Sequence, residues 1–148
     1  MLSLAMAVAV ITTGFAKNTS VNDPGAVVKQ AFTKEFSHIT VVTWDLISKE
    51  GIYEAAFTFN NEALKAYFSE DGEFLGTIRE VTKSQLPILV VKEMDQRYPD
   101  AKVAAVYEHS MKDGLNYYIT ILTNKGVLIL KATGNGELTV HKRNTHKL

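Results

Sequence analysis

Two stretches of the chain have apolar residues at the spacing of a helix. The first begins after Asp23-Pro24, which are favoured as the N-cap and first residue of a helix, and ends near Ser37-His38. The second is expected to open at Ser84, to carry Pro87 in its first turn and to stop at Pro99. The apolar stripes are Val28, Phe32 and Phe36 in the first helix and Ile88, Val91, Met94 and Tyr98 in the second.

After each helix the pattern alternates with a period of two, which is typical of strands. Four strands are predicted near 40–49, 52–60, 63–70 and 73–82, and four more near 102–112, 115–123, 127–133 and 137–144. Asp71-Gly72 and Asn135-Gly136 favour hairpins with type I′ turns, in which both central residues have positive φ. Consecutive hairpins require antiparallel pairing.

The second half of the chain resembles the first at a fixed distance. Val27-Val28-Lys29 returns as Val90-Val91-Lys92, a shift of 63, and Trp44 returns as Tyr107 at the same shift. Beyond one inserted residue the shift becomes 64. A period of this length indicates two copies of one supersecondary unit. The predicted fold is therefore α+β, with two tandem units at 24–82 and 83–148 that form one domain. Each unit is a helix plus a four-stranded antiparallel meander, and both helices lie on one face of an eight-strand sheet.

A sheet that is covered by helices on one face leaves its other face available. The alternation assigns to this open face Glu54, Thr58, Lys65 and Tyr67 in the first copy, and Tyr118, Thr120, Leu122, Ile129 and Lys131 in the second. The second set is too apolar for a solvated face. Trp44 and Tyr107 hold equivalent repeat positions, which favours a shared packing role in the core, although both residue types are also common at interfaces.

Charge and composition narrow the function classes. Sixteen basic residues balance sixteen acidic ones, so the basic footprint that nucleic acid binding needs is missing. The chain has no cysteine, which excludes disulfides and thiolate sites.

Residues 1–16 resemble a signal peptide with cleavage before Lys17, although nothing basic precedes the apolar run, as in a truncated start. A buried amino-terminal helix is the alternative. Residues 17–23 form a flexible lead-in, and the protein is expected to be periplasmic or secreted.

No motif for catalysis or for a cofactor is legible. The four histidines, of which His141 and His146 lie among basic residues near the carboxyl end, have no metal-binding spacing. Glu70-Asp71-Gly72-Glu73 lacks the ligand spacing of a calcium loop, and no nucleophile elbow occurs. We therefore expect no catalytic residue, no metal and no cofactor, and we expect that the protein is not an enzyme.

Several short motifs resemble the PepSY-like, beta-lactamase-inhibitor-like family of exported proteins. They run from Val42-Thr43-Trp44 through Tyr67-Phe68 to Asp71-Gly72-Glu73, and they return at Leu86-Pro87 and Tyr117-Tyr118. The resemblance covers about residues 24–144 and implies two tandem helix-plus-four-strand units. In the beta-lactamase inhibitory protein the sheets form a concave surface that grips a protein partner, and PepSY domains elsewhere are thought to restrain proteolysis. No inhibitory motif carries over to individual residues here.

Three functional hypotheses follow. The first is a non-catalytic exported module that binds or inhibits a protein or peptide partner through the open face of the sheet, without a stable membrane span and without binding nucleic acid. Its candidate contact residues are Tyr67, Tyr118, Trp44, Tyr107, Ile129 and Lys131. The second is an envelope binder of a small molecule or ion, with a pocket between the two sheets. The third is an enzyme with a cryptic site, which would need converging titratable groups.

Overall fold

The computed structural model describes residues 23–47, 49 and 51–144. The predicted signal peptide at 1–16 and the lead-in as far as residue 22 lie outside these residues. The elements are α1 (Ala26–Glu35), β1 (Thr43–Leu46), β2 (Ile52–Phe59), β3 (Glu62–Ser69), β4 (Phe74–Val81), a 3-10 turn (Lys83–Gln85), α2 (Ile88–Arg97), β5 (Lys102–Met111), β6 (Gly114–Thr123), β7 (Gly126–Thr133) and β8 (Leu138–Asn144).

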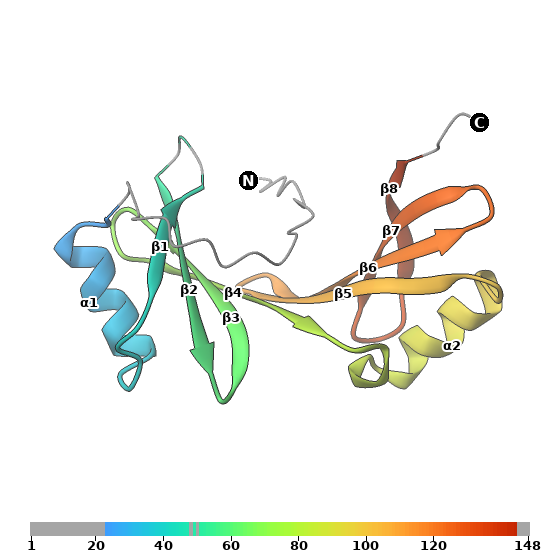
Figure 1. Ribbon diagram of the computed structural model, residues 1–148, viewed down its shortest axis with the longest axis horizontal. Coiled ribbons are helices and arrows are strands. Elements are labelled where there is room, and N and C mark those ends of the chain that lie inside the picture. Colours follow the sequence, from blue (N-terminus) through green and yellow to red (C-terminus); the bar gives the residue numbers. More distant parts are fainter. Residues whose placement is uncertain (1–22, 48, 50, 145–148) are drawn as a thin grey trace.

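The strands form one open antiparallel sheet in which spatial order equals chain order, from β1 to β8. This confirms the α+β class and the predicted meander of eight strands. Leu64, Arg79, Glu108 and Tyr117 are successive neighbours across β3, β4, β5 and β6, so their side chains share a face. Leu64 packs against the cluster under α1 and Tyr117 belongs to the cluster under α2. Both helices therefore cover the same face, on the outer side of a bent sheet (Figure 1).

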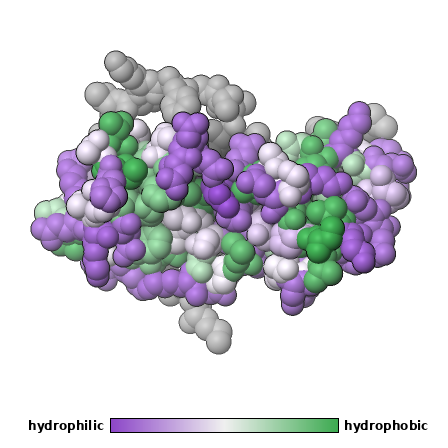
Figure 2. Space-filling model, turned by 90° about the horizontal axis from the view of Figure 1, so that it is seen from below, coloured by the Kyte–Doolittle hydropathy of each residue, from purple (hydrophilic) through white to green (hydrophobic). Residues whose placement is uncertain are grey.

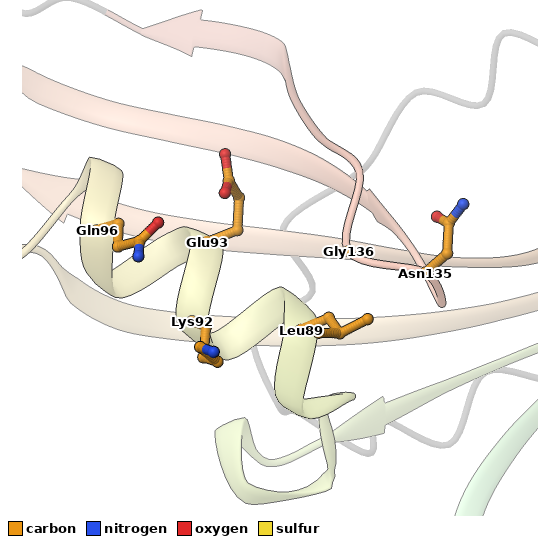
Figure 3. A pocket seen from close by; sticks show the side chains of 6 residues that line it. All are labelled: Leu89, Lys92, Glu93, Gln96, Asn135 and Gly136. Atoms are coloured by element: carbon orange, nitrogen blue, oxygen red, sulfur yellow. The ribbon is translucent and has the colours of Figure 1, made fainter.

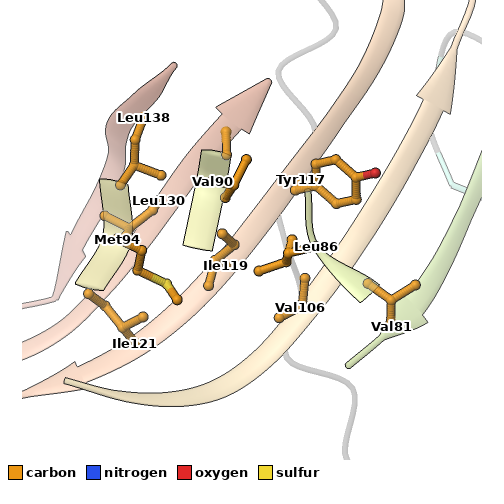
Figure 4. Packing of buried hydrophobic residues seen from close by; sticks show 11 residues of the cluster. Val81, Leu86, Val90, Met94, Val106, Tyr117, Ile119, Ile121, Leu130 and Leu138 are labelled. Carbon is orange, nitrogen blue, oxygen red and sulfur yellow. The ribbon is translucent and has the colours of Figure 1, made fainter. Parts of the chain in front are cut away.

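Each helix has its own hydrophobic cluster. The cluster under α1 is largely aromatic, with the Phe32 ring centred 5.3 Å from Trp44 and 5.1 Å from Phe57. The cluster under α2 is mainly aliphatic, and Figure 4 shows Val90 and Met94 packed over Ile119, Ile121 and Leu130. Between the two clusters the helix side of the sheet is polar. There the Arg79 guanidinium donates hydrogen bonds to Glu108 at 2.7 Å and to Glu62 at 2.8 Å.

Both helices begin later than the sequence pattern predicts. Gly25, not Asp23, is the N-cap of α1, and Asp23 instead forms an exposed ion pair with Lys29. The second helix begins at Ile88, after Pro87, because the residue before a proline is disfavoured in the α region, and Leu86 is extended at ψ 147°. The predicted stripe is wrong at Ile88, which is 70% exposed, and it missed Val90, which is fully buried, while Val91 packs against the same cluster partly buried.

Two hairpin turns differ from the predicted type. Gly72 has φ 85° and Gly136 has φ 93°, but Asp71 and Asn135 before them do not have positive φ, so neither turn is type I′. Asn60 and Asn61, between β2 and β3, both have positive φ. Each of the two glycines also lies against a helix. A Cβ added at Gly72 would lie 2.8 Å from Val27 Cγ1, and one at Gly136 would lie 2.8 Å from Leu89 Cβ.

Trp44 and Tyr107 do not share the expected packing role in the core. Trp44 is opposite Ala55 on β2, and the residue that occupies the same place in the second half is Val106, opposite Ile119 on β6. Both Trp44 and Val106 are buried under a helix. Tyr107 is one position further along β5, so it faces the opposite side of the sheet.

We predict that Gly72→Ala and Gly136→Ala each lower the free energy of unfolding by at least about 1–2 kcal/mol, because a Cβ there meets both positive φ and a helix. Urea unfolding of the variants measures the change. Gly134→Ala is the matched control, since nothing lies within 4 Å of a Cβ at that position. Equal stability of all three variants would contradict the close packing of these turns against the helices.

Candidate functional site

The face of the sheet opposite the helices, called the open face here, has a different character in the two halves of the chain. In the first half, the side chains of Tyr67, Glu54 and Lys65 bind one another. The Tyr67 hydroxyl donates a hydrogen bond to Glu54 Oε2 at 2.8 Å, and Lys65 Nζ lies 2.7 Å from Glu54 Oε1. Burial, followed by the charge of Glu54 and the hydrogen bond to it, raises the pKa of Tyr67 well above its usual value. Tyr67 is on the open face as predicted, but it is 4% exposed.

In the second half, aromatic rings and histidines lie together on the open face. The Tyr118 ring is centred 4.4 Å from His109 and 5.1 Å from His141. Directly across the strands, Tyr118 is opposite Tyr107 on one side and Lys131 on the other. We call Tyr107, His109, Tyr118, Lys131, His141 and Lys142 the β5–β8 patch.

An irregularity in β8 shapes this patch. Leu130 is opposite Val140 and Ile129 is opposite Lys142, so His141 is an extra residue that has no opposite partner on β7. Such a bulge re-aims a side chain. As a result, His141 contacts the Tyr118 ring while Lys142, the next residue, is opposite Ile129 on the same face.

His109 is the one buried polar residue of the described part of the chain, with 9% of its surface exposed. Burial lowers its pKa to about 4, and the charges of His141 and Lys131 act in the same direction. His109 is therefore neutral at neutral pH. It supports the Tyr118 ring and adds no charge to the patch.

The outer groups of the patch are not engaged within the described residues. The Tyr107 and Tyr118 hydroxyls and the side-chain ammonium groups of Lys131 and Lys142 have no hydrogen bond or ion pair there. Tyr107 is half-buried, and burial followed by the charge of Glu80 raises its pKa. The patch thus presents free hydrogen-bond donors next to aromatic rings.

The sequence prediction placed these residues only in part. Trp44 is in the core, with 7% of its surface exposed, and touches the Phe32 and Phe68 rings. Tyr107 was expected in the core but lies on the open face. Ile129 is on the open face opposite Thr120 and is buried by its neighbours. His109 and His141 were overlooked as patch members, although His109 stands two residues from Tyr107 on one strand and therefore shares its face.

Two hollows of the surface border α2. One, of about 270 Å³, lies between α2 and the turn after β7 and is lined by Leu89, Lys92, Glu93, Gln96, Asn135 and Gly136 (Figure 3). The other is next to the start of α2, where Ile88 and Leu89 are exposed, and the face that carries α2 shows a hydrophobic patch in that half (Figure 2). A pocket between two sheets, as the second hypothesis requires, has no place in this fold, since β4 and β5 pair and all strands form one sheet.

The described residues hold no group of three or more His, Asp or Glu side chains that could bind a metal ion. In the same residues, neither helix has the length and apolar character that crossing a membrane would need.

Comparison with solved structures places this arrangement among known folds. A protein assigned to the periplasm of Bacteroides eggerthii superposes with a TM-score of 0.71 at 17% identity, covering 84% of this chain and 90% of the other. A BLIP-like protein from Bacteroides fragilis gives 0.69 at 17% identity, over 86% and 93%. The chain has the BLIP-like fold. A DUF2874 family protein from Bacteroides ovatus gives 0.69 at 20% identity, over 80% and 89%.

These likenesses confirm, at the level of the fold, the resemblance read from the sequence motifs. No protein-family model matches the chain, and no curated protein matches it either. Because every identity is below 25%, the comparisons establish the fold and leave the activity to be argued from the surface.

We predict that His109 makes the stability of the protein depend on pH between about 6.5 and 4. Its folded pKa of about 4 is below the ordinary value of 6.5, so the unfolded chain binds the extra proton as the pH falls through this window. The free energy of unfolding should fall by about 2–3 kcal/mol more in the wild type than in His109→Gln. Urea unfolding at the two ends of the window measures this difference.

Ser110→Ala, one residue along β5, keeps His109 and should keep the wild-type dependence. If wild type and His109→Gln lose the same stability on acidification, His109 is not the buried neutral group that the geometry indicates.

Proposed function

We propose that this chain is a non-catalytic exported module that holds a protein or peptide partner on the open face of its sheet. The observation that carries the proposal is the one-sided covering of the sheet. Both helices pack on one face, while the other face carries Tyr107 and Tyr118 as direct cross-strand neighbours whose hydroxyls have no partner within the described residues. Tyrosine combines large apolar area with a polar group, which is the combination that protein interfaces favour.

The shape of the surface supports a macromolecular partner over a small ligand. Small-molecule sites are usually enclosed pockets of about 300–1,000 Å³. The two hollows beside α2, of about 270 and 570 Å³, are open to solvent rather than enclosed, whereas the aromatic side chains gather on the broad sheet surface. Tyr118, Tyr107, Ile129 and Lys131 are the contact residues we propose. Tyr67 supports the surface through Glu54, and Trp44 contributes only through the core.

Export and a regulatory role are part of the proposal. The apolar run at 2–11, the small residues Gly14 and Ala16, and the likeness to a protein assigned to the periplasm all favour the periplasm or the exterior. The likeness to a BLIP-like protein favours inhibition or restraint of an envelope enzyme as the consequence of binding.

We also infer that 24–82 and 83–148 are two copies of one unit joined in one domain. Val28 and Phe32 of α1 have the same roles as Val90 and Met94 of α2, a shift of 62. Ala55 on β2 and Ile119 on β6, and likewise Gly72 and Gly136, correspond at a shift of 64.

We predict that the Tyr107→Ala/Tyr118→Ala variant loses most of the partner that wild type retains from an envelope extract, at least about tenfold, because both interface rings are removed. The immobilised chain is exposed to the extract, and retained proteins are quantified by mass spectrometry. Lys92→Ala/Gln96→Ala, which alters the hollow between α2 and the turn after β7, is the control and should retain the partner. Matching far-ultraviolet circular dichroism and melting temperatures show that each variant is folded.

Loss of the partner from the α2 variant alone would move the site to the hollow beside α2. If wild type retains no protein specifically, the proposal is wrong, and a small ligand becomes the next candidate to test.

A further inference from the structure

The open face has an uneven distribution of charge, although the whole chain is neutral. On the strands of the second half, the charged side chains of this face are Lys102 at the start of β5, Lys131 and Lys142, accompanied by His109 and His141. The carboxylates of these strands and turns lie elsewhere: Glu108 is on the helix face, where it accepts from Arg79, and Asp113 and Glu137 are in turns. The second half of the open face therefore has cations without an acidic partner.

In the first half of the open face, a lysine is paired with a carboxylate. Lys65 on β3 is 2.7 Å from Glu54, and the side chains of the pair are 31% and 15% exposed. Lys131 on β7 is also half-buried on the open face, yet within the described residues no carboxylate reaches it. The nearest acidic residue in its cross-strand row is Glu80 on β4, three strands and roughly 14 Å away along the sheet.

The groups around Lys131 match a carboxylate. Lys131 is opposite Tyr118, Tyr118 is opposite Tyr107, and the two free hydroxyls can donate beside the ammonium group. A cation that is partly removed from water interacts more strongly with an anion than a solvated one does. A carboxylate bound here would satisfy Lys131 and at least one phenol hydroxyl together.

Lys142 adds a second position at a defined distance. It lies on β8 opposite Ile129, and Ile129 is two residues from Lys131 along β7. Two residues along a strand and one strand across correspond to roughly 8 Å between backbone positions. Side chains at i and i+2 of an extended peptide point the same way and are about 6.6 Å apart at the backbone, which flexible lysines can span.

We propose that the β5–β8 patch recognises an extended acidic segment of the protein partner, with carboxylates at positions i and i+2 that meet Lys131 and Lys142. The proposal rests on the proposed function, because it names the chemistry of the partner for that same open face. The bulge that brings His141 against Tyr118 also places Lys142 on this face, so the backbone of β8 is built to present the second cation.

The test uses a nine-residue peptide with glutamate at alternate positions and a matched peptide with glutamine in their place. Each is titrated into the full-length, nitrogen-15-labelled chain, and amide shifts are followed by NMR. We expect the glutamate peptide to bind at least about tenfold more tightly, with shifts concentrated on β5–β8 and an affinity that falls as salt is added. Lys131→Gln should weaken binding about tenfold.

Lys65→Gln is the matched control, since it removes a lysine from the same face that is already paired, and it should leave the peptide affinity unchanged. Equal binding of the two peptides, or equal effects of Lys131→Gln and Lys65→Gln, would overturn the inference. Complete displacement of the glutamate peptide by an equal concentration of inorganic phosphate would also overturn it, because the patch would then be a general anion site.

The two proposals fail in different ways. If the protein partner is lost with Tyr107→Ala/Tyr118→Ala but fully retained by Lys131→Gln, the open face binds a protein and the acidic segment is wrong. If wild type retains no protein and yet binds the glutamate peptide in the Lys131-dependent way, the surface chemistry stands and the proposed function is wrong.

Discussion

The pairing of β4 with β5 is the interaction on which the rest of the structure depends. Six register pairs, from Gly76 opposite Met111 to Val81 opposite Val106, convert two four-stranded meanders into one sheet. The helices do not join the halves in this way, because each packs over its own hydrophobic cluster. On the helix side, Arg79 reaches Glu62 on β3 and Glu108 on β5, so a charge-assisted network crosses the same junction. The open face is continuous because backbone hydrogen bonds join β4 to β5.

That continuity lets the two halves of the open face differ while they share one backbone. In the first half, Tyr67, Glu54 and Lys65 satisfy one another. The second half leaves its phenol hydroxyls and lysines available and buries His109 as a neutral support for Tyr118. The inner supports, such as Tyr67 and His109, are buried, and the outer donors are free. A surface of this kind can receive a partner without rearrangement of the sheet, and the cost of ordering the contact groups on binding is reduced.

The period-two pattern and the turn residues predicted all eight strands, with most boundaries within two residues, because each strand has one face under a helix and its alternation is strong. The sequence pattern gave a wrong assignment where a shift of one residue in the alignment of the two halves changes the face on which a side chain lies. Val27-Val28-Lys29 and Val90-Val91-Lys92 match by identity, but packing aligns Val28 with Val90, and a slip of one residue moves a strand side chain to the other face. That slip assigned Tyr107 to the core. The contact of His141 with Tyr118 depends on a bulge and on cross-strand neighbours, which local periodicity does not report.

The constraints on the two faces also explain why the fold alone does not name a partner. Inward-facing residues such as Ile119 and Leu130 must fill the space under a helix, so their size and polarity are set by packing. Outward-facing residues at alternate positions meet no such requirement. A half-buried lysine without a carboxylate carries a desolvation cost that an internal ion pair would offset, as Glu54 does for Lys65. Lys131 has no such carboxylate partner within the described residues, and the acidic segment proposed above would supply the compensating charge.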